Sequence, residues 1–271
     1  MIMHDIHDKS SLISKLFKTY PIPKEPFDPK GNWEHKYLGI DTYSIISVPK
    51  ILRKRSELKI ERKNLAGGMY NLIINSEREC RSQFLFFTDA NLKCRNDEIS
   101  TPESWYYESK VAKERSDTPY LKSGLKKEFD MKNDKLHIKT NGIDSYMNFS
   151  GAYTCKWCLF DSVQHMHKEA EKPLNFSMFD EYDALIGEQT FRFRESAKIE
   201  TTDGLKEVSC FELLGVGTTP STYWVDDSGR LLFYISGMEL AVLTEENGKE
   251  IIQLSTFKQW DNSSNMIPLS E

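Results

Sequence analysis

Apolar and charged side chains alternate along many short stretches of this sequence. In Leu58-Lys59-Ile60-Glu61 and in Leu136-His137-Ile138-Lys139, every second residue is apolar. A period of two places one set of side chains on a core face and the other set in water, as in a half-buried β-strand. The sequence therefore predicts a mainly β protein.

The candidate strands form two series. The first comprises Tyr37–Val48, Glu57–Arg62, Met69–Ile74, Gln83–Phe87, Trp105–Val111, Leu125–Met131 and Leu136–Thr140. The second comprises Thr190–Glu200, Glu207–Leu213, Ser221–Val225, Leu231–Ile235, Met238–Thr244 and Glu250–Leu254. Turn residues such as Asn141-Gly142 and Asn247-Gly248 separate them and favour tight hairpins. Because strands do not alternate with helices, we expect an antiparallel sheet.

One stretch has a helical period instead. It runs from Thr154, a suitable N-cap, to a stop at Pro173. Its apolar stripe consists of Cys155, Leu159, Val163, Met166 and Ala170. The predicted fold is a large curved antiparallel sheet or half-barrel, with this amphipathic helix packed on it and a short N-terminal helix over residues 10–19.

The chain is expected to divide into three parts. Residues 1–32 comprise the N-terminal helix and a proline-rich tether, because four prolines after position 20 forbid a continuing helix. Residues 33–260 form a single β-rich domain, with the first β series in 33–152, the helix in 153–170 and the second series in 171–260. Residues 261–271 are expected to be a flexible tail.

Charge and hydropathy restrict the partners. The 36 basic residues face 41 acidic ones, whereas a nucleic-acid-binding domain needs a surplus of positive charge, so we expect no nucleic acid partner. No window of about 18 apolar residues occurs, so we expect no membrane span. The first 30 residues lack the apolar core of a signal peptide. We therefore expect a cytoplasmic protein, whose five cysteines stay reduced.

The motif Cys155-Lys156-Trp157-Cys158, with His165 and His167 after it, leaves three interpretations open. A zinc site is disfavoured, because Cys158 and His165 on one helix lie about 10 Å apart along its axis. A redox dithiol at a helix start is the second possibility. The third, which we favour, is a set of structural thiols. We expect no metal site, no cofactor, and folding without disulfides.

The stretch from Tyr223 to Arg230 predicts a hairpin and offers candidate catalytic groups. Asp226 precedes Asp227-Ser228-Gly229, so it serves either as a turn residue or as an acid or base beside Tyr223 and Arg230. His137, in a strand where apolar and polar residues alternate, is the fourth candidate catalytic residue. The alternative of turn formation stays open for Asp226.

Aromatic residues are denser than a small β core needs. Most of them are expected in the core, but some could line a concave binding face. The candidate ligand-binding residues are Phe86, Trp105, Tyr107 and Trp224.

Residues 176–243 combine the long strands Phe191–Glu200 and Glu207–Leu213 with the Tyr223–Arg230 hairpin. This pattern resembles the curved half-barrel of lipoprotein-carrier (LolA/LolB-like) proteins, in which a lipocalin-like concave sheet covered by helices holds acyl chains. The resemblance implies that a hydrophobic or amphipathic small molecule binds in the concave face. The alternative is a cofactor-independent enzyme, a lyase, isomerase, cyclase or hydrolase, that uses acid and base residues in the same cavity.

Overall fold

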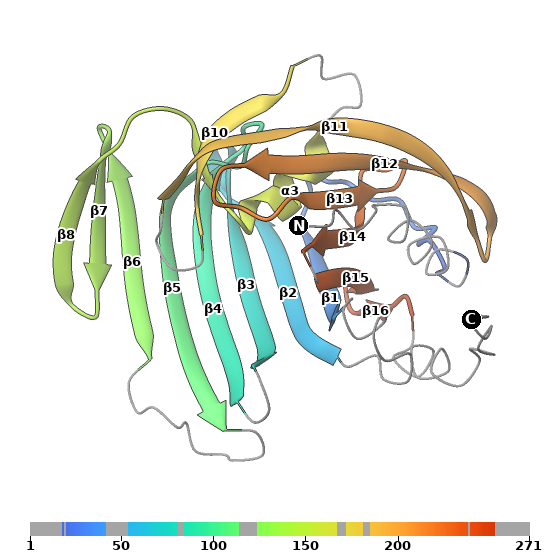
Figure 1. Ribbon diagram of the computed structural model, residues 1–271, viewed down its shortest axis with the longest axis horizontal. Helices are drawn as coiled ribbons and strands as arrows, with labels where there is room; N and C mark the ends of the chain where they lie inside the picture. The colour runs from blue at the N-terminus through green and yellow to red at the C-terminus, as the bar shows by residue number, and fades with distance from the viewer. Residues whose placement is uncertain are drawn as a thin grey trace, which may run out of the picture.

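The computed structural model describes residues 18, 20–41, 54–80, 84–113, 124–166, 172–180, 185–237 and 239–252. Within them, one large curved sheet of 16 strands contains most of the backbone (Figure 1). Its first strands are β1 (Trp33–Asp41), β2 (Lys54–Asn64), β3 (Met69–Cys80), β4 (Phe84–Arg95), β5 (Pro102–Lys113), β6 (Leu125–Lys132), β7 (Lys135–Thr140) and β8 (Ile143–Asn148). The others are β9 (Tyr153–Cys155), β10 (Leu174–Phe179), β11 (Leu185–Thr201), β12 (Gly204–Gly215), β13 (Ser221–Val225), β14 (Leu231–Ser236), β15 (Glu239–Glu246) and β16 (Lys249–Glu250).

The two predicted series pair into one continuous meander. From β8 the order runs through β7 to β1, crosses to β15 and returns through β14 to β9, while β16 pairs with β15 outside this path. Every described pair is antiparallel except the parallel pair of β9 with β10. The predicted fold class, a large curved and mainly antiparallel sheet with one helix, is confirmed. The helix expected over residues 10–19, except residue 18, and the tail over 261–271 lie outside the described residues.

The sheet curls so that β11 and β12 pass across the upper ends of β3 to β5, with the helix α3 (Cys158–His165) between the two layers (Figure 1). Side chains of the helix reach both layers. Phe160 packs on Tyr37 of β1 and on Tyr223 and Tyr234 of the second series. Trp157, just before the helix, stacks on Tyr107 of β5. The helix is therefore enclosed by the sheet.

The helix is shorter than the sequence predicted and has no solvent face within its first seven residues. Tyr153 to Cys155 pair with β10 as a strand, so the helix begins only at Cys158. All side chains from Cys158 to Gln164 are buried. Two of the polar ones bond within the helix, where Ser162 donates to the Cys158 carbonyl and Gln164 donates to the Phe160 carbonyl. The Gln164 Oε1 also accepts from Leu231 N of the second series. No helix among the described residues is long and apolar enough to span a membrane.

The proline-rich segment before β1 joins the core. Tyr20 is fully buried and its hydroxyl donates to the Leu243 carbonyl at 2.8 Å. Farther along, the Arg230 guanidinium donates to the carbonyls of Pro23 and Glu25, at 3.2 and 2.7 Å. One buried arginine thus fixes the N-terminal segment on the second β series.

The charge of Arg230 is balanced by two buried carboxylates. Its Nη1 lies 2.9 Å from Asp226 Oδ2 and its Nε lies 2.8 Å from Glu246 Oε1. The same Glu246 oxygen lies 3.2 Å from His35 Nε2. His35 is buried, with its ring stacked on both Phe27 and Trp33.

We predict that His35 makes the protein less stable in mild acid. Burial lowers the pKa of His35 below its ordinary value of 6.5, and the hydrogen bond with Glu246 offsets this only in part. The unfolded chain therefore takes up the proton more readily, so the free energy of unfolding falls as the pH drops below about 6.5. Urea unfolding between pH 7.5 and 5 measures the slope.

His35→Gln should flatten this slope, whereas the control His137→Gln, at a solvent-accessible ring, should leave it unchanged. Glu246 contributes to the free energy of unfolding over a different, lower pH range. Burial alone would raise its pKa, but the bonds from His35 and Arg230 hold it below its ordinary 4.5, so its contribution is lost only in stronger acid. An unchanged slope in His35→Gln would contradict the prediction.

Candidate functional site

The face of the sheet that carries α3 has a filled end. Trp105 stacks on Phe129 with ring centroids 4.5 Å apart and also contacts Phe179 of β10 at 5.4 Å. Tyr107 stacks on Trp157 at 6.0 Å. Two of the predicted ligand-binding residues, Trp105 and Tyr107, thus lie in packed aromatic clusters near the helix.

The same face continues beyond the helix to an open end. On β4, Phe86 has the same parity as the buried Ala90 and Leu92, so it points to the helix side of the sheet. Its side chain is 37% exposed. It pairs with Val111 of β5, which is half-buried. Phe86 is therefore the predicted ligand-binding residue that solvent can reach on this face.

Hydroxyl side chains lie among the apolar ones at the open end. Three of them point inward by strand alternation: Ser76 on β3, Thr88 on β4 and Ser109 on β5. They lie side by side across the strands, because Ser76 is opposite Thr88 and Thr88 is opposite Ser109. Ser109 also pairs with Leu125 of β6. The open end thus offers both apolar and hydrogen-bonding groups.

The fourth predicted ligand-binding residue lies elsewhere. Trp224 is on β13 next to the buried Tyr223, so its side chain points to the opposite face of that strand. It is half-buried, and its Nε1 donates to Thr222 Oγ1 at 3.3 Å. The structure does not bring it near Phe86.

The predicted catalytic residues occupy three separate places. Tyr223 is buried in the interior against Phe160 and Phe191. Asp226 and Arg230 form a buried pair in the turn after β13, where Asp226 Oδ1 also accepts from the amides of Ser228 and Arg230. His137 lies far along the sheet on β7, paired with Asp144 of β8. Only Asp226 and Arg230 are brought together.

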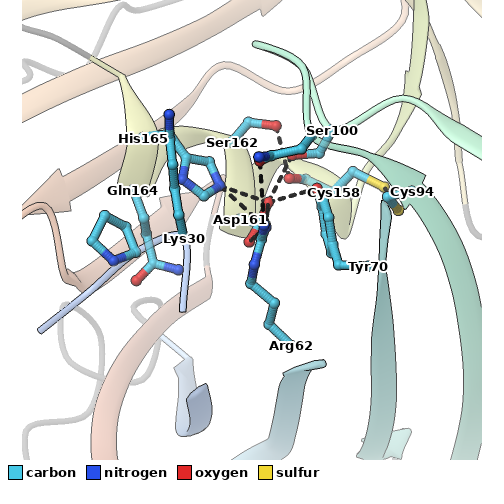
Figure 2. A network of polar contacts seen from close by, with 12 residues as sticks. Lys30, Arg62, Tyr70, Cys94, Ser100, Cys158, Asp161, Ser162, Gln164 and His165 are labelled. Atoms are coloured by element: carbon cyan, nitrogen blue, oxygen red, sulfur yellow. Dashed lines mark hydrogen bonds and ion pairs between the residues drawn. The ribbon is translucent and has the colours of Figure 1, made fainter. Parts of the chain in front are cut away.

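A buried polar cluster centres on Asp161 of the helix (Figure 2). Both carboxylate oxygens accept from Arg62 Nη1 at 2.8 Å. Oδ2 also accepts from the Tyr70 hydroxyl at 2.7 Å, from the Ser100 hydroxyl at 2.8 Å and from His165 Nε2 at 2.8 Å. These partners come from β2, β3, the β4–β5 loop and the helix itself.

The cluster holds a charged carboxylate inside the protein. Burial alone would raise the pKa of Asp161, but the hydrogen bond from His165 and the nearby Arg62 cation outweigh it and hold the pKa below its ordinary value. The Arg62 guanidinium also lies over the Tyr70 ring, 3.4 Å from its centroid. Among the described residues, Arg62 Nε and His165 Nδ1 are buried without a hydrogen-bond partner.

This cluster was not predicted from the sequence, although one signal was available. On β2, Leu58, Ile60 and Arg62 share the inward parity, so the alternation points an arginine into the core. A buried arginine requires a carboxylate partner. The helix supplies one in Asp161, whose side chain is buried between those of Phe160 and Ser162 in sequence.

Three buried thiols lie beside this cluster. Cys94 comes from β4, Cys155 ends β9 and Cys158 begins the helix. Cys94 Sγ is 3.8 Å from Cys158 Sγ. Burial raises the pKa values of Cys94 and Cys155 well above 9.0. At Cys158 burial acts in the same direction, but hydrogen bonds from Cys155 and Cys94 outweigh it and lower the pKa to about 5.

A cleft of about 500 Å³ opens near the start of β9 and β10. It is lined by Arg95, Asp97, Glu98, Ile99, Thr101, Gly151, Ala152, Tyr153, Pro173, Leu174 and Asn175. The loop that forms one wall also reaches the interior, because Ser100 bonds Asp161 and the Ile99 carbonyl accepts from Thr154 Oγ1 at 2.6 Å. Ser100 has a φ of 53°, a left-handed conformation that non-glycine residues seldom adopt.

Comparison with known proteins gives a fold relationship alone. No family model matches the sequence, and no curated protein sequence matches it. A crystal structure of a β-barrel-like protein of the domain of unknown function DUF1849 from Brucella abortus is similar, with a TM-score of 0.54 and 9% identity. The match covers 82% of this chain and 98% of that chain. The similarity supports a barrel-like curved sheet.

Proposed function

We propose that the chain binds an amphipathic small molecule with an apolar chain at the open end of the concave face, around Phe86. The observation that carries this proposal is the exposure of Phe86, 37%, on the same face as the buried Ala90 and Leu92. A large apolar side chain that lies at the edge of a core, on its inner face, offers contact area that solvent covers in the free protein.

The composition of the open end supports an amphipathic ligand over a purely apolar one. Phe86 and Val111 would contact the apolar part, while Ser76, Thr88 and Ser109 provide hydroxyl groups for a polar part. The end near α3 is a poorer place for a ligand, because Trp105 and Tyr107 already pack on Phe129 and Trp157 there. The resemblance to lipoprotein carriers agrees with an acyl chain as the apolar part.

The alternative of a cofactor-independent enzyme is less well supported by the positions of its candidate residues. Tyr223, the Asp226–Arg230 pair and His137 lie at three separate places, and none of them lines the open end or the cleft. General acid and base groups need to reach one substrate together. We therefore favour binding.

The prediction is that Phe86→Ala weakens binding of a long-chain fluorescent fatty acid or a fluorescent lysophospholipid by about tenfold. Full burial of a phenylalanine is worth up to about 3 kcal/mol, and half of this upper value, about 1.5 kcal/mol, corresponds to about one factor of ten in Kd. Fluorescence titration below the critical micelle concentration of the probe measures the change.

Tyr146→Ala is the matched control. Tyr146 is also an exposed aromatic residue, at 61%, but lies on β8 with the opposite parity to the inward Met147. It should leave the affinity unchanged. The proposal fails if the wild type shows no saturable binding, or if both variants weaken binding equally.

A further inference from the structure

Three thiols from three different elements meet at the first turn of α3. We propose that Cys158 reacts with a hydroperoxide and then forms a reversible disulfide with Cys94, so that the interior of this protein holds a redox site. The site is distinct from the open end of the concave face and does not depend on the binding function.

The first argument is distance. Cys94 Sγ and Cys158 Sγ are 3.8 Å apart and in contact. A disulfide requires about 2.05 Å, so the sulfurs must approach by somewhat less than 2 Å, which side-chain rotation supplies more readily than backbone movement. Cys210, by contrast, lies on β12 with its thiol directed at the Phe211 carbonyl and has no such neighbour among the described cysteines.

The second argument is the local backbone. A reactive thiol at a helix start is usually preceded by a strand, and the sequence alone did not indicate one. The structure supplies it, since β9 ends at Cys155 and α3 begins at Cys158. The amide groups of the first helical turn carry a partial positive charge that favours a thiolate at Cys158.

The third argument is the difference between the three thiols. The contact with Cys94 at 3.8 Å and hydrogen bonding from Cys155 favour the ionised form of Cys158, against the opposing effect of burial. Cys94 and Cys155 stay protonated because burial raises their pKa values. The cluster thus contains one nucleophile and neighbouring thiols that can supply a proton and a second sulfur.

The proposed reaction has two steps. In the first, the Cys158 thiolate attacks one oxygen of hydrogen peroxide, so an S–O bond forms, the O–O bond breaks and Cys158 becomes a sulfenic acid. The leaving hydroxide takes up the proton that Cys158 released on ionising and becomes water. In the second, the Cys94 sulfur attacks the sulfenic sulfur of Cys158, the S–S bond forms, and the S–O bond breaks. The released hydroxide takes the Cys94 proton, so two thiols and one peroxide give one disulfide and two waters.

The oxidant must be small. Cys94 and Cys158 are fully buried and Cys155 is 3% exposed, so a protein disulfide cannot reach their sulfur atoms directly. Hydrogen peroxide is close to water in size. Two wall residues of the cleft, Ala152 and Tyr153, immediately precede Thr154 and Cys155, so a solvent-filled cleft lies within a few residues of Cys155 along the chain. Among the described residues, no three Cys, His, Asp or Glu side chains are arranged to hold a metal ion.

The test starts with the unmodified, fully reduced chain. It is exposed to hydrogen peroxide at one equivalent and then at a few equivalents, the remaining thiols are alkylated, and the protein is digested without reduction. Mass spectrometry should find a peptide that joins Cys94 to Cys158. Treatment with dithiothreitol before digestion should remove it. Circular dichroism at each dose verifies that the protein stays folded.

Three variants refine the test. Cys155→Ser should retain the Cys94–Cys158 link, and the matched control Cys210→Ser should behave as the wild type. Cys94→Ser should instead leave a sulfenic acid at Cys158 that dimedone traps. Thermal melting checks that each variant folds. If a variant does not fold, the presence or absence of the Cys94–Cys158 link in the unmodified chain still tests the proposal.

Several results would overturn the proposal. These are absence of the Cys94–Cys158 link in folded wild-type protein, a link that joins mainly Cys155 to Cys158, and oxidation spread equally over Cys80 and Cys210. Stoichiometric metal in the purified protein, with the three thiols protected from alkylation until a chelator is added, would also overturn it.

Discussion

Asp161→Asn is expected to lower the free energy of unfolding by about 3–5 kcal/mol, the usual cost of breaking a buried ion pair by removing one partner. The variant keeps the size of the side chain but removes its charge, which leaves the buried Arg62 guanidinium without a counter-charge. It also replaces one accepting oxygen with an amide that donates, where Tyr70, Ser100 and His165 all donate at present. Urea unfolding followed by circular dichroism measures the change.

A rescue variant separates the lost charge pair from a general defect in the helix. Arg62→Met added to Asp161→Asn removes the uncompensated cation and should recover part of the loss, so the two changes are not additive. Asp144→Asn is the matched control. Asp144 pairs with a histidine at the exposed edge of the sheet, so its change should stay within about 0.5 kcal/mol. A cost below 1 kcal/mol for Asp161→Asn would contradict the role given to this cluster.

The strands were predictable where local pattern and tertiary pairing agree. Ser221–Val225 was predicted with the bounds that β13 has, because its alternation is clear and turn residues flank it. Gln83–Phe87 was predicted too short. β4 extends to Arg95 through Asp89-Ala90-Asn91, whose residues do not favour strands. Pairing with β3 on one side and β5 on the other forms the strand there despite its composition.

The helix was predicted to be too long because a periodic stripe reports side-chain position and does not report backbone pairing. Cys155 fits the stripe, but β10 pairs with the segment Tyr153 to Cys155 as a parallel strand. The sequence did not predict β10 itself. Its residues Ser177 to Phe179 pair with Tyr153 to Cys155, which are too far away in sequence for a local pattern to relate them. This pairing also determines the thiol cluster, because the junction between β9 and α3 places Cys155 and Cys158 next to Cys94.

The candidate sites also differ in how far a local sequence pattern could predict them. Phe86 was identified from aromatic density, and its inward direction follows from the alternation of β4. The partners of Asp161 come from segments up to 99 residues apart in sequence, so no local pattern could assemble them. The Tyr223–Arg230 hairpin was predicted as a hairpin, and the structure adds that Arg230 also binds Glu246 and the N-terminal segment.

Phe160→Ala is expected to lower the free energy of unfolding by about 3–5 kcal/mol, the range for emptying a large aromatic site in a core. Phe160 is the side chain of α3 that joins the two halves of the sheet, with ring centroids 5.6 Å from Tyr37 and 5.0 Å from Tyr234. The protein has no short route to refill this space, because the surrounding tyrosines are fixed on strands of both series. Thermal and urea unfolding measure the loss.

Phe86→Ala removes the same number of atoms and is the matched control. Because its side chain is 37% exposed, it should cost no more than about 1 kcal/mol. The two variants should therefore separate stability from binding. Phe160→Ala should destabilise the fold, and at temperatures where it stays folded it should bind the fatty-acid probe as the wild type does, while Phe86→Ala should show the reverse. If Phe160→Ala cost as little as Phe86→Ala, the helix would not be a packed part of the core and could move out of the concave face to admit a ligand there.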